Sequence, residues 1–281
     1  MRWQKMDDDF FQGLDFVAFD TETTGLWAPV NRIVELGAVK FRLGNNRPDI
    51  FSELVNPERR IPPETIRVHG ISDSMVQGAD TIRPVLERFF EFCGPESILI
   101  AHNAKFDISF VGCEMSRVGL PMISNRVLDT VDICKQYHPG LDSYSLLSLS
   151  QEFAISRTQN HRAADDAALV WKLFSKVSEA FPYIKSDSLL RREFNFYSMA
   201  QWQGDTPELP EEFADLTRAI EEELTVDIVY GAPGRRQEQR RIRPLRIHSL
   251  KNTTYIAAYC EKVEDERTFR LDRIKKFSLV D

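Results

Sequence analysis

The chain has 281 residues, of which 42% are hydrophobic and 28% are charged, and its formal net charge is −7 at pH 7. This length suggests about two domains, and the hydrophobic content supports packed cores and excludes an intrinsically disordered chain. From Leu224 to the C-terminus, 13 Lys and Arg residues face 8 Asp and Glu residues, a net charge of +5, so the preceding residues carry −12. The basic surplus therefore lies at the C-terminal end.

The N-terminus and the cysteines indicate a cytoplasmic protein. The first residues, MRWQKMDDDFF, contain no apolar signal-peptide core, and no stretch approaches the roughly 18 apolar residues of a membrane span. The four cysteines are scattered without a C-x-x-C pair, so they are interpreted as reduced core residues rather than as zinc ligands or a disulfide framework. We therefore expect cytoplasmic localisation and no membrane association.

The first predicted element, from Phe16 to Glu22, is a buried strand that ends in two carboxylates. The apolar run FVAF is followed by Asp20 and Glu22, and side chains two apart on a strand point to the same face, about 6–7 Å from each other. Such carboxylates repel unless a cation lies between them, and hard oxygen ligands favour Mg²⁺ or Mn²⁺. The pattern predicts a divalent-metal site that acts on phosphate.

Two later segments carry further candidates for this site. The apolar strand from Ser97 to Ala101 leads through a turn into a helix whose start contains Asp107. Asp166 falls in the first turns of a helix with apolar residues at helical spacing, and His161 lies at or just before that helix; Asp165 competes with Asp166 for the metal role. Four carboxylates and one histidine from three segments predict a two-metal hydrolase with a general base.

These motifs, in this order, resemble the DEDDh branch of the DnaQ-type 3′→5′ exonucleases, the family of the proofreading subunit of bacterial replicative polymerase. The resemblance covers about 16–175 and rests on FDTETTGL, RIVELGAV, VHGI, AHNAKFDISFV, LDTVDICKQYHPGLDSYSLLSLSQEFAI and HRAADDA. It implies an RNase H-like α/β fold, a mixed central sheet flanked by helices. The family's H-x₄-D spacing selects Asp166 over Asp165. We expect two Mg²⁺ or Mn²⁺ ions, held by Asp20, Glu22, Asp107 and Asp166, with His161 as the general base.

Other residues of the same motifs are candidates for substrate contact. They are Thr23, Thr24, Gly25, His69, Asn103 and Phe106. The first three form a tight turn whose backbone N–H groups can reach a terminal nucleotide. The ring of Phe106 is interpreted either as a platform beneath a base or as a core residue, and His102 as a structural hydrogen-bonding group or a weaker substrate contact.

The chain after the nuclease motifs contains a connecting segment and a small β domain. Leu189 to Trp202 is predicted to be a short amphipathic segment, and GDTPELPEE an exposed linker. A short helix, FADLTRAIEEEL, precedes five strand-like pieces separated by turn signals, which suggests a small barrel or sheet. The predicted boundaries are 1–182 for the exonuclease domain, 183–223 for the connecting segment and 224–281 for the β domain.

These C-terminal strands resemble a WYL domain, a Sm/SH3-like β-barrel module of many bacterial regulators. The resemblance rests on Val229-Tyr230, RRIRPLRI, TYIAAYCE and RTFRLDRI, although Tyr255-Ile256-Ala257 replaces the Trp-Tyr-Leu of the family name. The arginines of these strands are interpreted as a solvated face or as a strip that follows a phosphate backbone, since Arg binds phosphate in a bidentate manner. The candidates for strand contact are Arg240, Arg243, Arg270 and Arg273.

The combined prediction is a cytoplasmic, metal-dependent 3′→5′ exonuclease that releases nucleoside 5′-monophosphates, with DNA and single-stranded 3′ ends favoured. Its nucleic-acid partner would also contact the basic accessory domain. Two alternatives are kept. In one, the WYL-like domain senses a strand or a ligand and the nuclease is its effector. In the other, the chain is the exonuclease subunit of a replication or repair complex and docks on an unidentified protein partner through Leu189 to Trp202.

Overall fold

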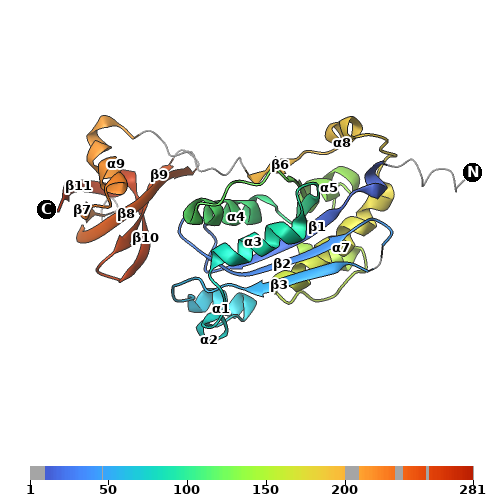
Figure 1. Ribbon diagram of the computed structural model, residues 1–281, viewed down its shortest axis with the longest axis horizontal. Helices are drawn as coiled ribbons and strands as arrows, with labels where there is room; N and C mark the ends of the chain where they lie inside the picture. Colours follow the sequence, from blue (N-terminus) through green and yellow to red (C-terminus); the bar gives the residue numbers. More distant parts are fainter. Residues whose placement is uncertain (1–9, 46, 200–208, 232–236, 251–252, 281) are drawn as a thin grey trace, which may run out of the picture. The chain divides into compact units, whose positions relative to one another are not determined.

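The computed structural model describes residues 10–45, 47–199, 209–231, 237–250 and 253–280. The chain divides into two compact units, Met1–Gln203 and Gly204–Asp281, and Figure 1 shows that the first holds a sheet with helices on both faces. The predicted linker lies largely outside the described residues, as do Trp202 and parts of two predicted turns. Among the described residues, no helix has the length and apolar character needed to cross a bilayer.

The described part of the first unit contains a six-stranded mixed sheet in the order β3-β2-β1-β4-β5-β6. Its strands are β1 (Phe16–Thr23), β2 (Ile33–Phe41), β3 (Asp49–Leu54), β4 (Ile98–Ala101), β5 (Arg126–Asp129) and β6 (Tyr197–Ser198). β1, β4 and β5 run parallel to one another, whereas the pairs β1–β2, β2–β3 and β5–β6 are antiparallel. The predicted mixed sheet with flanking helices is confirmed.

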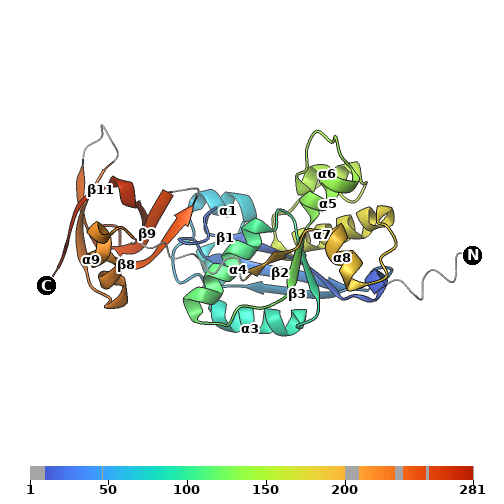
Figure 2. The ribbon, with the colours of Figure 1, turned by 90° about the horizontal axis from the view of Figure 1, so that it is seen from above.

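Helices cover both faces of this sheet (Figures 1 and 2). One core, which contains Val17 and Phe19, packs against α3 (Ile82–Cys93) and α4 (Lys105–Val118). The other, which contains Phe16 and Ala18, packs against α5, α6 and α7. The remaining elements are α1 (Pro63–His69), α2 (Asp73–Val76), α5 (Thr130–Tyr137), α6 (Leu146–Glu152), α7 (Ala163–Val177), α8 (Asp187–Glu193), η1 (Phe10–Gly13) and η2 (Ser178–Ala180).

The alternation along β1 decides where the acidic residues point. Because side chains alternate across a strand, Asp20 and Glu22 continue the face of Phe16 and Ala18, which α7 covers. Thr21 continues the opposite face, which α4 covers. The carboxyl end of β1 therefore lies between the two helices that carry Asp107 and Asp166.

A glycine on β2 allows α7 to begin directly against the sheet. A Cβ at Gly37 would lie 2.1 Å from the backbone N of Ala164 and 2.2 Å from the carbonyl C of Ala163, far inside van der Waals contact. Only glycine permits this approach at the observed backbone positions. The first turn of α7 is thereby held at a fixed height above the end of β1.

The described part of the second unit contains a five-stranded sheet in the order β10-β9-β8-β7-β11, with every neighbouring pair antiparallel. Its elements are η4 (Glu211–Phe213), α9 (Ala214–Glu221), β7 (Val226–Tyr230), β8 (Glu238–Leu250), β9 (Thr253–Cys260), β10 (Asp265–Arg270), η5 (Leu271–Arg273) and β11 (Ile274–Leu279). Leu216 and Ala219 of α9 are buried in the core of this unit. β10 and β11 are the two edges, so the closed barrel of the prediction is not confirmed.

Candidate metal site and nucleic-acid contacts

The structure brings the predicted acidic residues together at the carboxyl end of β1. Ligand atoms of Glu22, His161 and Asp166 lie within 4.8 Å of one another. Asp20 lies close enough to Asp107, Glu22 and Asp166 for each of these charges to act on it. Residues from β1, α4 and the start of α7 thus form one acidic cluster. Its members are Asp20, Glu22, Asp107 and Asp166.

Asp107 is held from the neighbouring strand by Thr21. The backbone N–H of Thr21 donates to Asp107 Oδ1 at 2.9 Å, and the Thr21 hydroxyl donates to the same oxygen at 2.7 Å. This leaves Oδ2 of Asp107 without a bond from Thr21. Thr21 therefore orients one oxygen of the carboxylate and leaves the other for a ligand.

Asp166 and its neighbour Asp165 have different surroundings. Asp166 is buried, whereas Asp165 is exposed and accepts from the Asn160 amide at 3.0 Å. Oδ2 of Asp166 accepts from the Gln159 amide at 2.6 Å and lies 3.9 Å from Nδ1 of His161. Oδ1 of Asp166 is buried and has no hydrogen-bond partner within the part of the chain that the structure describes. A buried, unpartnered carboxylate oxygen is costly, and it suits an oxygen-seeking cation.

The electrostatics of the cluster also fit a cation. Burial raises the pKa of Asp20 well above its usual value, and the charges of Asp107 and Glu22 add to the shift. Burial, with the charges of Asp166 and Glu35, raises the pKa of Glu22 to about 8. Burial raises the pKa of Asp107 to about 7, against the opposing effect of the Thr21 bonds. A bound divalent cation would invert this local field and favour the charged carboxylates.

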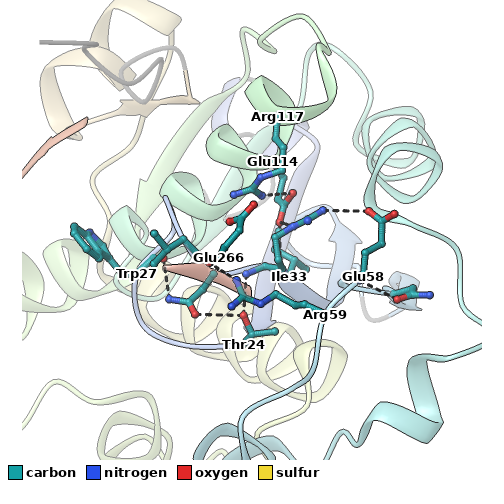
Figure 3. Close-up of polar contacts among 12 residues, drawn as sticks. Thr24, Trp27, Ile33, Glu58, Arg59, Glu114, Arg117 and Glu266 are labelled. Atoms are coloured by element: carbon teal, nitrogen blue, oxygen red, sulfur yellow. Dashed lines mark hydrogen bonds and ion pairs between the residues drawn. The ribbon is translucent and has the colours of Figure 1, made fainter. Parts of the chain in front are cut away.

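The predicted substrate turn is tied down by its own polar groups (Figure 3). The Thr23 hydroxyl donates to the Gly25 carbonyl at 2.6 Å. Thr24 exchanges bonds with Arg32, since its N–H donates to the Arg32 carbonyl at 2.9 Å and its hydroxyl accepts from the Arg32 N–H at 3.0 Å. The N–H of Thr24 is therefore not available for the predicted contact with a nucleotide. A Cβ at Gly25 would lie 2.6 Å from Oδ1 of Asn31, which explains the glycine.

A buried ion cluster lies next to this turn (Figure 3). Glu114 of α4, which is fully buried, accepts from Nε of Arg32 at 2.9 Å and from the Ile33 N–H at 3.3 Å. Arg117 forms an ion pair with the second oxygen of Glu114 at 2.5 Å. These contacts join the end of the turn to the helix that carries Asp107.

The AHNAKFD segment is organised by Asp129 at the end of β5. Its carboxylate accepts from the backbone N–H groups of Asn103 and Ala104, both at 3.0 Å, and caps α5 through Val131 N–H at 2.9 Å. Asn103 is exposed and has a φ of 61°, a left-handed conformation that asparagine tolerates better than most residues. The Asn103 side chain is thus presented at the surface by a fixed loop.

The other three candidates of these motifs have mainly structural surroundings. Nδ1 of His102 lies 2.9 Å from the Thr130 hydroxyl, and burial lowers the pKa of His102 to about 4, as expected for a structural hydrogen-bonding group. Phe106 is half-buried, with its ring centroid 4.9 Å from that of Phe110. His69 is buried, and its Nδ1 accepts from the Ile71 N–H at 3.0 Å.

Sequence reasoning overlooked residues that organise the site without belonging to its metal set. They are Thr21, Glu35, Asp129, Gln159 and Arg162. Glu35 had a readable signal, because it is the one charged residue within the apolar run IVELGAV. Asp129 follows the apolar pair Val127-Leu128 at a strand end, a similar signal. The partners of both acids are distant in sequence, which explains why their roles were not predicted.

In the second unit the candidate arginines fall into two groups. Arg240 and Arg270 form ion pairs with Glu238 and Asp272 at 2.5 and 2.8 Å. Arg243 lies over the ring of its cross-strand neighbour Tyr259, 5.6 Å from the centroid. Within the described residues, Arg243 and Arg273 make no side-chain ion pair. Arg235 and Arg236, which belong to the same basic run, lie outside the described residues.

Comparison with known proteins identifies the family. The family model described as "Exonuclease" matches residues 17–174, and a model of the WYL domain matches residues 211–279. The first match spans more than half of the chain. The chain therefore belongs to this exonuclease family, as the sequence predicted, and it carries a WYL domain.

Two curated relatives are "DNA polymerase III PolC-type" proteins. That of Listeria welshimeri is 38% identical over 182 residues, which cover 63% of this chain and 12% of the polymerase. That of Caldanaerobacter subterraneus subsp. tengcongensis is 36% identical over 196 residues, which cover 70% of this chain and 14% of the polymerase. The chain thus spans a small part of the length of these relatives.

Solved structures agree on the fold. The nuclease domain of 3′hExo, a DEDDh family member bound to rAMP, matches with a TM-score of 0.54 and 16% identity, covering 68% of this chain and 98% of that one. Cell-death related nuclease 4 matches with a TM-score of 0.52 and 15% identity, covering 59% and 64%. At these identities the likeness concerns the fold, and the first unit has the RNase H-like α/β fold that the sequence predicted.

Proposed function

We propose that this exonuclease hydrolyses the 3′-terminal phosphodiester of DNA, with single-stranded ends favoured, and releases nucleoside 5′-monophosphates. The observation that carries the proposal is the acidic cluster itself. Its carboxylates come from β1, α4 and α7; Asp107 and Asp166 are buried, Asp20 and Glu22 are half-buried, and all four stay together although their mutual repulsion opposes it. Structures keep such strain mainly where function requires it.

The donor set fits two divalent cations of the Mg²⁺ or Mn²⁺ type. Asp20, Glu22, Asp107 and Asp166 would hold them, and the unpartnered Oδ1 of Asp166 is a ready ligand atom. When bound, such ions activate water and stabilise charge on phosphate and leaving oxygens. Metal dependence is general for DEDDh exonucleases, which supports this assignment.

His161 is proposed as the general base. Its side chain is 47% exposed, so it can meet a water and a substrate, and its Nδ1 lies 3.9 Å from Asp166 Oδ2 at the edge of the cluster. It would take the proton from the attacking water as the water's oxygen bonds to the phosphorus. The bond between phosphorus and the 3′-oxygen of the shortened strand then breaks, and that oxygen leaves with the electron pair and is protonated to the 3′-hydroxyl.

The substrate side is proposed from the loops around the cluster. The Thr23–Gly25 turn would support the terminal nucleotide through the groups that its internal bonds leave accessible, with Asn103 and His69 on either side and Phe106 near the base. DNA is favoured because the curated relatives are named DNA polymerases. A cytoplasmic location fits this substrate.

The WYL domain is proposed to bind the strand upstream of the cleaved end. Its sheet, which we propose curls toward a Sm/SH3-like barrel, presents Arg243 stacked on Tyr259, a pairing suited to a phosphate next to an unstacked base. Arg240, Arg270 and Arg273 would add charge. The functional division we propose keeps 1–182 as the catalytic part, 183–223 as the connection and 224–281 as the binding part.

Two other functions remain as named alternatives to this proposal. The WYL domain could instead act as a sensor with the nuclease as effector, or the chain could be the exonuclease subunit of a replication or repair complex. A single experiment separates these functions: the purified chain is incubated with 3′-labelled single-stranded DNA, duplex DNA and RNA in Mg²⁺ and in Mn²⁺, with Asp20→Ala as control.

Turnover of single-stranded DNA by the unaided chain, lost in Asp20→Ala, is the expected result. Strand binding without turnover in either metal would favour the sensor. Turnover that requires an added cell fraction would favour the subunit of a complex. Faster digestion of RNA than of DNA would overturn the substrate preference.

A further inference from the structure

One more carboxylate, that of Glu35, is buried beside the acidic cluster and does not belong to it. Glu35 of β2 is 1% exposed and lies directly opposite Glu22 in the antiparallel β1–β2 pair. Like charges in that relation destabilise a sheet. Unlike the cluster residues, however, Glu35 has its own cation, because Arg162 forms an ion pair with it.

Both oxygens of Glu35 are fully used. Oε2 accepts from the backbone N–H of Ala163 at 2.8 Å and from Nε of Arg162 at 3.0 Å. Oε1 accepts from Nε of Arg162 at 3.1 Å and from its terminal NH2 group. A carboxylate with this many donors has no lone pair directed at the cluster, so Glu35 is a poor candidate for a metal ligand.

The same contacts hold the backbone that carries His161. Arg162 is the N-cap of α7, and its side chain gives this helix no capping bond. Glu35 supplies the missing cap from β2 by accepting from the first N–H of the helix, where a negative charge is favourable. The side chain of Arg162 and the N–H of the next residue are therefore fixed to one carboxylate.

The orientation of His161 depends more on the Glu35–Arg162 contacts than on contacts of its own side chain. Its φ is 51°, a sparsely populated conformation for a residue with a Cβ, which persists only where the surroundings impose it. Its half-exposed ring lies 3.9 Å from Asp166 and within 4.8 Å of Glu22, and neither carboxylate is within hydrogen-bond distance of it. Its direction over the cluster is thus set by the backbone that Arg162 and Glu35 hold.

We propose that the Glu35–Arg162 pair is a positioning device for His161: it sets the histidine's backbone so that the imidazole meets the attacking water, and so acts on the chemical step. This inference rests on the proposed role of His161 as general base. In this proposal Glu35 and Arg162 contact neither metal nor substrate. They act through His161, which directly precedes the N-cap of α7.

The test compares full-length variants for kcat, KM and Mn²⁺ binding on a 3′-labelled single-stranded DNA. Arg162→Ala should lower kcat by about 10- to 100-fold, as is usual for loss of a supporting residue around a metal site, with KM and calorimetric Mn²⁺ affinity close to wild type. Arg162→Lys should recover part of the loss, because lysine keeps the charge but not the two-pronged geometry.

A matched control is available in the same domain. Arg42 pairs with Asp15 through two hydrogen bonds at the surface, so Arg42→Ala breaks an Arg–carboxylate pair far from His161 in the sequence and should keep wild-type kcat. If Arg162→Ala fails to fold, Glu35→Gln and Arg162→Lys still report, since both keep a polar group of similar size. Wild-type kcat in both of these folded variants would overturn the proposal.

A double-mutant cycle with His161→Ala decides the route of the effect. If Arg162 acts through His161, Arg162→Ala should cost little further in the His161→Ala background, since coupled residues are not additive. A full additional loss there, or a loss of Mn²⁺ affinity in Arg162→Ala, would overturn the proposal and make Arg162 a support of the metal ligands. A wild-type chain without metal-dependent turnover would instead overturn the proposed function itself, and the inference with it.

Discussion

Charged side chains are compensated differently in the acidic cluster of the first unit and in the five-stranded sheet of the second unit. In the cluster, Asp20 and Glu22 are kept near other carboxylates, and their pKa values are raised because burial and like charges oppose ionisation. In the sheet, Arg241 and Arg270 lie at the surface, each with a carboxylate partner. Burial of uncompensated charge is costly, whereas exposed ion pairs contribute little. Uncompensated charge is therefore the stronger sign of a site.

The contrast also applies within each unit. In the first unit Glu35 is compensated by Arg162, and we assign it to positioning rather than to metal binding. In the second unit Arg243 lacks a carboxylate partner among the described residues and lies over Tyr259 instead. By the same criterion, Arg243 is a better candidate for strand contact than Arg240 or Arg270.

The largest effect is expected from the two neighbouring aspartates of α7. Asp166→Ala should lower turnover by about a thousandfold or more, because it removes a buried carboxylate from the proposed two-metal site. Asp165→Ala should stay near wild type, since its side chain is exposed and bonded to Asn160. Initial rates on labelled single-stranded DNA and circular dichroism of both variants provide the measurement. An inactive Asp165→Ala beside an active Asp166→Ala would show that the assignment within HRAADDA is wrong.

His161→Ala should lose about 10²- to 10⁴-fold in rate, the usual contribution of a general base. Its calorimetric Mn²⁺ affinity should remain, because the cluster and not the imidazole is assigned as the ligand set. The ring is near enough to Asp166 for the opposite assignment to be a real alternative. Loss of Mn²⁺ binding together with activity would make His161 a ligand and would extend the uncompensated site to a fifth residue.

The third prediction concerns the stability of the metal-free protein. The folded-state pKa values of Glu22 and Asp107 are raised to about 8 and about 7, so these groups hold their protons more tightly when folded. Their contribution to stability is present below the unfolded pKa values, near 4, and is lost as pH rises through the folded values. In chelator, the melting temperature should therefore fall by several degrees between about pH 6 and about pH 8.5.

Saturating Mn²⁺ should reduce or reverse that fall, because the cation binds the deprotonated carboxylates. Glu22→Gln serves as the control: it removes one of the two titrating groups and should flatten the metal-free profile. Scanning calorimetry across this pH range gives the measurement. A melting temperature in chelator that rises with pH over the same window would mean that the cluster is not strained when empty.

The sequence predicts which carboxylates come together because the signals for them are local. The run FVAFDTE is apolar up to the residue where the carboxylates begin, so its alternation alone predicts which face Asp20 and Glu22 share. The helical spacing after HRAADDA likewise places Asp166 near the start of a helix. Both features depend on neighbours within a few residues, which periodicity describes.

The sequence does not predict contacts between segments that are distant along the chain. Thr21 and Asp107 are 86 positions apart, and Glu35 and Arg162 are 127 apart, so no local pattern pairs them. The predicted use of the Thr24 N–H also fails for this reason, because its partner lies across a turn at Arg32. Whether an arginine has a carboxylate partner depends on sheet register. Arg241 and Arg243 are two residues apart, but Arg241 lies opposite Asp227 and Arg243 lies opposite Tyr259.

That distinction leads to the smallest expected effect. If Arg243 contacts a phosphate while Tyr259 supports a base, Arg243→Ala should weaken binding of a long single strand several-fold. It should also flatten the log–log salt dependence by about 0.7, the amount expected for one phosphate contact on a single strand. Arg241→Ala should change neither, because Arg241 is already bonded to Asp227. Hydrolysis of a dinucleotide should be unaffected, since it is too short to reach beyond the catalytic site. An unchanged salt slope in Arg243→Ala would favour a WYL domain that binds a partner protein or a small ligand. The lack of a carboxylate partner would then not be a sign that an arginine on an exposed sheet binds the strand.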